Sequence, residues 1–217
     1  RQDGLGFDLH PVFSVLETDY GIAISARREA PDDHFYWRVT PFMLPSYTII
    51  PGRYGGNFTF TGAVPVDDAN MIGMTVTWNP EHPIEGRPFV EVDEKYFPTR
   101  NKFNDYQIDR EAQKTKTFTG IAGGARVQDL AVQEDQRGPI SDRTTEHLGT
   151  SDMGVIATRQ RLIKQARDLQ GGIEPPQPHN PAAYRIRSMG VSAPRDVPWE
   201  RLMDENMPVR DGVTVTG

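Results

Sequence analysis

The chain has 217 residues and a formal net charge of −6, from 24 lysines and arginines against 30 aspartates and glutamates, and it contains no cysteine. The lack of cysteine excludes a disulfide framework, a thiolate zinc site, a cysteine nucleophile and an iron–sulfur cluster held by this stretch of chain. The negative charge argues against a general phosphate-binding surface, so we expect no nucleic-acid partner. No run approaches 18 consecutive apolar residues and the first twenty residues lack a secretion signal, so the sequence predicts a cytoplasmic protein without membrane contact.

Short runs of β-branched and aromatic residues, bounded by Gly, Pro and Asp, fill the chain from residue 11 to residue 79. Their length and alternation are typical of strands, and tight turns such as Asp19-Tyr20-Gly21 favour an antiparallel meander. The expected strands cover residues 12–16, 22–26, 35–40, 47–50 and 71–78.

Residues 79–125 are polar and show no sustained period, which predicts a long surface excursion with short helical turns. The pattern becomes helical over residues 126–170. Within this range we expect a long amphipathic helix that is capped by Ser151, stopped by Gly171-Gly172, and apolar along the stripe that faces the core. The stripe consists of Val155, Ile156, Leu162, Ile163 and Leu169.

Four prolines between residues 175 and 181 then predict a stiff linker, followed by a polar tail. We therefore expect a domain over residues 1–172 and a linker with tail over residues 173–217. A sheet followed by one long helix that lies across it is an α+β arrangement. A curved antiparallel sheet that grips a helix leaves a cavity suited to an apolar ligand.

The five histidines are scattered and form no pair at metal-ligand spacing, so a complete metal site from this chain alone is not expected. Signatures of a serine hydrolase, a phosphate loop and a dinucleotide-binding turn are absent as well. The densest polar stretch covers residues 128–152. As a helix it would place Asp129 and Gln133 on one face and Leu130 and Glu134 on the next. This pattern fits either a metal-binding carboxylate or a solvated acidic face.

Residues 128–167 carry several motifs in a fixed order, and their sequence is QDLAVQEDQRGPISDRTTEHLGTSDMGVIATRQRLIKQAR. The pieces QE, GPI, DR, EHLGTSD and RxRL resemble, in order and spacing, the C-terminal catalytic segment of Rieske non-haem iron aromatic-ring-hydroxylating oxygenases. The resemblance is to the phthalate 4,5-dioxygenase-like group of large subunits. Upstream segments similar to the same group are YGIAISARRE, YWRVTPFMLPSYTIIPG, VPVDD and TWNPEHP. The resemblance covers most of residues 12–170.

The resemblance implies a helix-grip (START-like) fold, in which a curved antiparallel sheet holds a long C-terminal helix across it. It also implies a mononuclear Fe(II) held by two histidines and one carboxylate, a triad that leaves positions open for dioxygen. Asp129, with Glu134 five positions on, matches the family's carboxylate spacing best, so Asp129 is the expected metal ligand. Asp135 and Asp142 compete with it, because other branches place the ligand in a Glu-Asp pair.

Two segments of the family are missing from this sequence. One holds the Cys and His pairs of the 2Fe-2S Rieske cluster, and the other is the DxxHxxxxH segment that supplies the two iron histidines. In the family both precede the region present here, and this sequence starts at Arg1 within apparent structure. We therefore expect a C-terminal fragment that retains one iron ligand of three.

The function that the resemblance implies is that of the oxygenase component of a ring-hydroxylating dioxygenase. Electrons from NAD(P)H would pass through a flavin/iron–sulfur reductase and the Rieske cluster to the iron of a neighbouring subunit in a homotrimer. Dioxygen would then be inserted into an aromatic, phthalate-like substrate. One alternative is an O-demethylating monooxygenase of methoxybenzoates. Others are a non-catalytic helix-grip ligand-binding module and a structural subunit of an oxygenase assembly.

A carboxylated substrate requires guanidinium groups that can bind it bidentately. The candidates are Arg27 and Arg28, at the end of the second expected strand, and Arg53, in a Gly-rich turn. Only one of the adjacent pair can face inward if the strand alternates. Trp78 is expected to add an apolar contact. Further candidates for the wall of the pocket are Phe42, Ile49, Phe58 and Met74.

Overall fold

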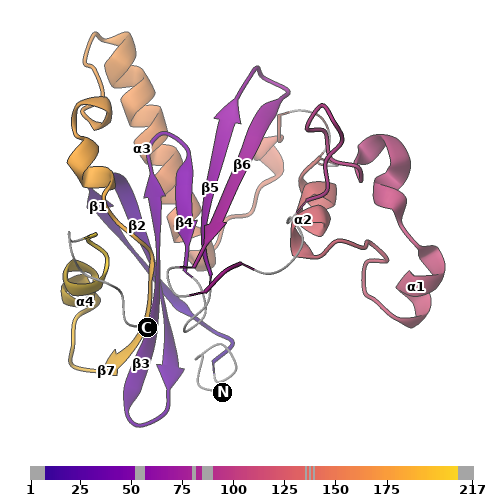
Figure 1. Ribbon diagram of the computed structural model, residues 1–217. Helices are drawn as coiled ribbons and strands as arrows, with labels where there is room; N and C mark the ends of the chain where they lie inside the picture. The colour runs from indigo at the N-terminus through magenta and orange to yellow at the C-terminus, as the bar shows by residue number, and fades with distance from the viewer. Residues whose placement is uncertain are drawn as a thin grey trace. The chain divides into compact units, whose positions relative to one another are not determined.

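The computed structural model describes residues 8–51, 57–79, 82–84, 90–134, 136, 138 and 140–209 (Figure 1). The chain divides into two compact units. The first comprises residues 1–64, 71–84 and 147–217, and the second comprises residues 65–70 and 85–146. The expected boundaries at 1–172 and 173–217 stay a prediction. No helix among the described residues is long and apolar enough to cross a membrane.

The first unit is built on one antiparallel sheet. Six of its strands follow one another in space in the order β1-β2-β3-β4-β5-β6, and β7 pairs with β3. The predicted meander is therefore confirmed. The strands are β1 (Val12–Thr18), β2 (Gly21–Ala30), β3 (His34–Met43), β4 (Tyr47–Ile50), β5 (Phe58–Pro65), β6 (Met71–Trp78) and β7 (Met189–Pro194).

The first hairpin depends on a glycine. Gly21 begins β2 with φ +144°, a backbone conformation that L side chains rarely adopt. A Cβ at this position would lie 2.3 Å from the carbonyl oxygen of Phe42 on β3. The turn after Thr18 can therefore close against β3 only with glycine at this position.

One face of the sheet packs against α4 (Trp199–Asn206). Residues 23, 25 and 27 of β2 share this face with residues 37 and 39 of β3, as the register shows. The Trp37 and Trp199 rings stack with their centroids 6.3 Å apart. The buried cluster on this side consists of Tyr20, Ala23, Trp37, Val39, Met43, Ile49, Met189, Ala193, Trp199, Leu202 and Met207.

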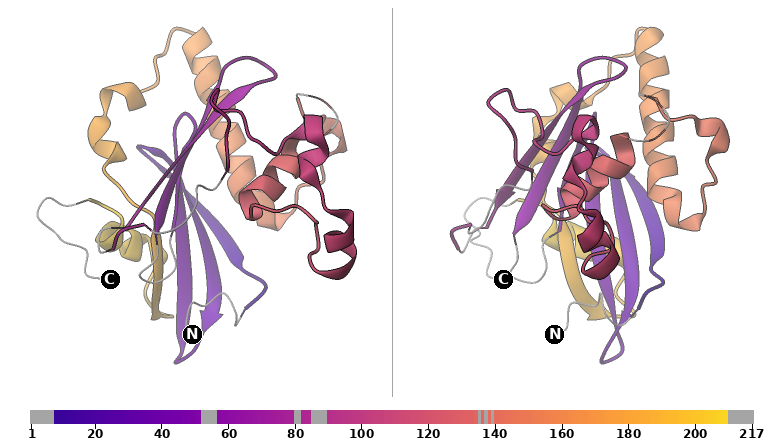
Figure 2. Two further views of the ribbon diagram at one scale, coloured as in Figure 1. Left: turned by 45° about the vertical axis from the view of Figure 1, so that its right-hand side comes forward. Right: turned by 90° about the vertical axis from the view of Figure 1, so that its right-hand side faces the viewer.

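The other face of β1 and β2 carries α3 (Met153–Gln170) (Figures 1 and 2). Gly154 approaches the sheet so closely that a Cβ there would lie 2.8 Å from Cγ2 of Ile24. Seven residues on, Arg161 Nη1 forms an ion pair with Glu17 Oε2 of β1 at 2.8 Å. A curved antiparallel sheet with a long helix across it is consistent with the helix-grip fold, so the predicted α+β class is confirmed.

Two details of α3 differ from the prediction. Ser151 does not cap the helix, because Thr150–Asp152 form a 3₁₀ turn and no side chain caps the first turn of α3. The predicted apolar stripe is also only partly buried, since Val155, Ile163 and Leu169 are exposed. The sheet-facing side also carries Gly154 and Arg161. The predicted stop is correct, because α3 ends at Gln170 and Gly172 follows with φ +83°.

The segment after α3 packs into the first unit. Its short helical turns, η4 (Gln177–His179) and η5 (Pro181–Tyr184), lead into β7 and α4. Gln177 is buried, and its Nε2 donates to the carbonyl oxygen of Asp19 at 3.0 Å. The Tyr184 hydroxyl donates to the carbonyl oxygen of Leu44 at 2.6 Å. The region expected to be a linker and tail thus supplies one strand and one helix to the core.

The second unit consists of short helices and loops. Within its described residues lie η1 (Lys102–Gln107), α1 (Arg110–Thr115), α2 (Ala125–Glu134) and η2 (Arg143–Thr145). Asp109 caps α1 by accepting hydrogen bonds from the amides of Glu111 and Ala112. The expectation of an excursion with short helical turns over residues 79–125 therefore holds for the described part of that range.

Candidate functional site

Asp129 lies in the middle of α2, in the second unit. The helix begins after Gly123 and Gly124, which have φ +101° and +83°, and the buried residue of its first turn is Val127. The Asp129 side chain is exposed, and its carboxylate forms no hydrogen bond with another described residue. Both of its oxygens are therefore free to bind a cation. A carboxylate on a helix is a suitable third ligand for an iron that two histidines also hold.

The described residues do not complete such a site. Among them there is no group of three or more His, Cys, Asp or Glu side chains that could hold a metal ion. Asp129 fits an iron centre as one ligand, and the remaining ligands would have to come from outside the described part of the chain.

The two competing carboxylates differ from Asp129. Asp135 lies outside the described residues. Asp142 Oδ1 accepts hydrogen bonds from Thr144 Oγ1 at 2.6 Å and from the Thr144 amide at 2.9 Å, and so caps η2. These two bonds, the hydroxyl's first, hold the pKa of Asp142 below its usual value. Oδ1 of Asp142 is thus engaged in a local cap, whereas no such bond holds the Asp129 carboxylate among the described residues.

The C-terminal end of α2 is bonded to η1. The Tyr106 hydroxyl donates to Glu134 Oε2 at 2.7 Å, and Tyr106 is 6% exposed. Sequence reasoning missed Tyr106, because a single tyrosine in a polar segment gives no periodic signal. The sequence motifs identify Glu134 only by its five-residue spacing from Asp129.

Tyr106 lies in an unusual backbone turn. Asp105, Tyr106 and Gln107 have φ of 48°, 53° and 51°, so three consecutive residues other than glycine are left-handed. Each such residue costs about 1–2 kcal/mol relative to the right-handed region. Strain of this kind persists only where surrounding contacts over-determine it, and it concentrates at functional sites.

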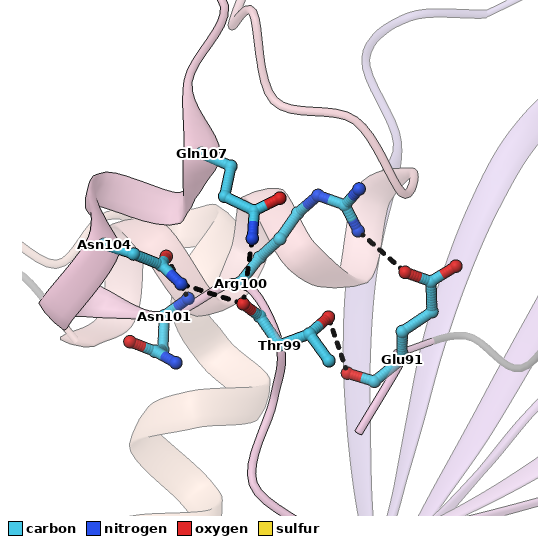
Figure 3. A network of polar contacts seen from close by, with 6 residues as sticks. All are labelled: Glu91, Thr99, Arg100, Asn101, Asn104 and Gln107. Carbon is cyan, nitrogen blue, oxygen red and sulfur yellow. Dashed lines mark hydrogen bonds and ion pairs between the residues drawn. The ribbon is translucent and has the colours of Figure 1, made fainter. Parts of the chain in front are cut away.

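Hydrogen bonds around Asn101 and Thr99 hold this turn (Figure 3). The Asn101 side chain accepts from the amide of Phe103, and the Asn101 amide donates to Asn104 Oδ1 at 3.1 Å. The carbonyl oxygen of Thr99 accepts from Asn104 Nδ2 at 2.8 Å and from Gln107 Nε2 at 3.3 Å. Short polar side chains thus replace the backbone bonds that a regular helix would supply.

The segment before this turn is fixed by a pair of charges. Arg100 Nη1 lies 3.1 Å from Glu91 Oε2, and the Thr99 hydroxyl donates to the carbonyl oxygen of Glu91 at 3.3 Å (Figure 3). The Thr99 amide donates to the same carbonyl oxygen at 2.9 Å. Val92 and Pro98 form an isolated β-bridge inside this loop. These contacts join the two ends of the loop that precedes the turn with Tyr106, so the start of that turn is fixed.

In the first unit, Arg27 and Arg28 lie on opposite faces of the sheet. Arg27 pairs with Trp37, and its guanidinium carbon lies 4.3 Å from the centroid of the Phe35 ring, on the side of α4. Arg28 lies on the other face, the one that carries α3. Its Nη1 is buried and has no hydrogen-bond partner among the described residues. The pKa of Asp8 is lowered first by hydrogen bonds from backbone amides and also by the Arg28 charge, so a carboxylate already lies within electrostatic reach of Arg28. The buried Nη1 itself is a candidate for binding an anionic ligand.

The other predicted pocket residues do not gather around Arg28. Arg53 lies outside the described residues. The Trp78 ring stacks on Phe58 at 5.5 Å, and register through Phe60 and Ile49 places Phe58 on the face of α4. Ile49 belongs to the buried cluster on that face, and Met74 Cε lies against Gly62 there. Of the proposed wall, only Phe42 shares the face of Arg28.

In the first unit the sheet with α3 across it is consistent with a helix-grip fold. In the second unit α2 carries a candidate metal ligand, Asp129. The chain belongs to the family described as LigXa C-terminal domain like, whose model matches residues 6–211. The family resemblance inferred from the motifs is thereby confirmed.

Three curated relatives are similar to the chain. The 3-chlorobenzoate-3,4-dioxygenase oxygenase subunit of Comamonas testosteroni is 29% identical over 91% of this chain and 51% of its own length. The phthalate 4,5-dioxygenase oxygenase subunit of Pseudomonas putida is 32% identical over 76% of this chain and 40% of its own length. The 5,5'-dehydrodivanillate O-demethylase oxygenase subunit of a Sphingobium species is 26% identical over 76% of this chain and 35% of its own length. The chain spans about half or less of the length of these relatives.

Proposed function

We propose that this chain is the C-terminal catalytic part of the oxygenase component of an aromatic-ring-hydroxylating dioxygenase. The observation that carries the proposal is the free carboxylate of Asp129, on the helix where the sequence motifs predict an iron ligand. Family membership and the names of the relatives support the same class of enzyme.

Asp129 would hold the iron together with two histidines from outside this chain. The bound iron would supply the activation of dioxygen, with electrons from NAD(P)H that arrive through a reductase and a 2Fe-2S Rieske cluster in another part of the protein. The share of this chain is to fix the direction of the Asp129 carboxylate and to bind the aromatic substrate. A homotrimer in the cytoplasm, as the resemblance implies, belongs to the same proposal.

Arg28 is the residue we propose for recognition of a substrate carboxylate. Its buried Nη1 lacks a partner among the described residues, and a guanidinium binds a carboxylate with two parallel hydrogen bonds. Arg27 is a weaker candidate, because its guanidinium already contacts the Phe35 ring. This arrangement favours an aromatic acid of the phthalate type over a neutral aromatic compound.

O-demethylation is the second candidate function, because one relative is named as an O-demethylase subunit. The two functions differ in their products, since a dioxygenase adds both oxygen atoms to the ring while a demethylase releases formaldehyde from a methoxy group. Oxygen uptake by the natural protein with its reductase, measured over a panel of benzoates, phthalates and methoxybenzoates, separates them. We expect uptake coupled to a cis-diol and no formaldehyde. Formaldehyde in step with oxygen uptake would favour the demethylase, and no uptake with any aromatic acid would favour a ligand-binding module.

A further inference from the structure

Glu134 occupies a position that local helix stability does not explain. It is the last residue of α2, and the last turn of this helix contains no basic residue. The helix dipole places partial negative charge at this end, so a carboxylate here is unfavourable. The compensating contact is the hydrogen bond from the buried Tyr106 hydroxyl at 2.7 Å. Glu134 thus destabilises the end of its own helix and is held by a residue distant in sequence. A local cost of this kind indicates a functional role for the residue.

Val127 and Glu134 lie on one face of α2, and Asp129 lies on the opposite face. Val127 and Glu134 are seven residues apart, so they lie on the same face of the helix. Val127 is 2% exposed and Glu134 is bonded to η1, so this face is held at both ends. Asp129 comes two residues after Val127, about 200° around the helix axis. Its exposed carboxylate therefore lies on the opposite side from the two attachments.

The partner of Glu134 is itself held rigidly. Tyr106 lies within three consecutive left-handed residues, and its amide donates to the carbonyl oxygen of Asn101 at 3.0 Å. The bonds from Asn104 and Gln107 to Thr99 close the same turn (Figure 3). Because the backbone of Tyr106 is held rigidly, its hydroxyl cannot move with α2. The hydrogen bond to Glu134 can therefore restrict the rotation of α2 about its axis.

We propose that the hydrogen bond between Tyr106 and Glu134 fixes the rotation of α2 about its axis and thereby aims the Asp129 carboxylate. Tyr106 and Glu134 are positioning residues, and neither needs to touch the iron or the substrate. This inference rests on the proposed role of Asp129 as an iron ligand. Without the tether the last turn of α2 can fray, as helix ends do, and the carboxylate loses its fixed direction.

The test compares Tyr106→Phe with Tyr96→Phe in the natural protein. Tyr96 belongs to the same unit and is 85% exposed, so its hydroxyl serves as the matched control. Glu134→Gln keeps an acceptor for the Tyr106 hydroxyl, whereas Glu134→Ala removes it. The first readout is hydrogen exchange of the α2 amides, measured both as isolated and after removal of iron. The second is the dissociation constant for Fe(II).

In Tyr106→Phe and Glu134→Ala we expect the α2 amides to exchange about tenfold faster and the dissociation constant for Fe(II) to rise about tenfold. Glu134→Gln should change both less, and Tyr96→Phe should change neither. Two results in Tyr106→Phe would overturn the inference. One is faster exchange of the α2 amides with an unchanged dissociation constant for Fe(II), and the other is unchanged exchange of these amides. Full iron retention in Asp129→Ala would overturn the proposed function. This failure can be told apart from a failure of the inference, because hydrogen exchange of α2 in the iron-free protein does not depend on whether Asp129 binds iron.

Discussion

Arg27 and Arg28 are neighbours in β2, but their side chains lie on opposite faces of the sheet. Arg27 contacts the Phe35 ring on the side of α4. On the side of α3, Arg28 has a buried Nη1 without a hydrogen-bond partner in the described part of the chain. Two residues of identical chemistry thus have different environments. This difference makes each a control for the other.

Arg28→Ala should raise KM for a carboxylated aromatic substrate by about 10- to 100-fold, because a hydrogen bond to a charged group contributes about 1.5–3 kcal/mol. Arg28→Lys should recover only part of this loss, since lysine cannot bind a carboxylate as a planar fork. Arg27→Ala should leave KM unchanged and lower the free energy of unfolding by about 0.5–2 kcal/mol through the lost cation–π contact. Steady-state kinetics of the three variants measures the changes in KM. A rise in KM for Arg27→Ala equal to that for Arg28→Ala would contradict the proposed role of Arg28.

Gly154→Ala should destabilise the protein by about 1–2 kcal/mol, although alanine is the better helix former by about 1 kcal/mol. The added Cβ would lie 2.8 Å from Cγ2 of Ile24, so α3 or the sheet must shift. The double variant with Ile24→Ala should cost less than the sum of the two single variants, because the clash is gone. Urea unfolding measures all three, and additive losses would show that α3 does not pack on Ile24 at this position.

Asp105→Gly should raise the free energy of unfolding by about 0.5–1 kcal/mol. Asp105 is exposed and left-handed, with φ 48°, and glycine adopts this conformation without the steric cost of a Cβ. Thermal unfolding of the variant measures the change. A lower stability in Asp105→Gly would mean that the turn is not left-handed at this residue.

Asp142 should stabilise the protein only where it is ionised. The Thr144 hydroxyl and amide hold its pKa below the usual 3.8, so the folded state favours the carboxylate. Its contribution is therefore complete above pH 3.8 and is lost as the pH falls through the lower pKa of the folded state. The stability difference between the natural protein and Asp142→Asn should shrink in that acidic range. A difference that is constant from neutral pH down to the acid transition would contradict the cap.

The sequence predicted five of the seven strands and missed β5 and β7; the five were found because their signals are local. Strand-length runs between Pro, Gly and Asp, and the tight turn at Gly21, define the meander without reference to the rest of the molecule. The same holds for the end of α3 at Gly171, since a helix stop depends on one or two residues.

The features that sequence reasoning missed depend on tertiary contacts. The buried side of α3 was predicted only in part, because it also carries Gly154 and Arg161, which match the sheet by size and charge and not by hydrophobicity. β7 and α4 were hidden by the prolines before them. Tyr106 gave no signal either, because its turn is built from side-chain bonds to Thr99 and Asn101 that no periodic pattern encodes.

Iron stoichiometry shows whether Asp129 binds iron. The natural protein, Asp129→Ala and Asp142→Ala would be purified in parallel, and iron would be counted per chain after the Rieske cluster has been accounted for. We predict that Asp129→Ala loses the mononuclear iron while Asp142→Ala retains it, with both variants folded by circular dichroism. Full mononuclear iron in Asp129→Ala would contradict the account, and its loss in Asp142→Ala alone would move the ligand to Asp142.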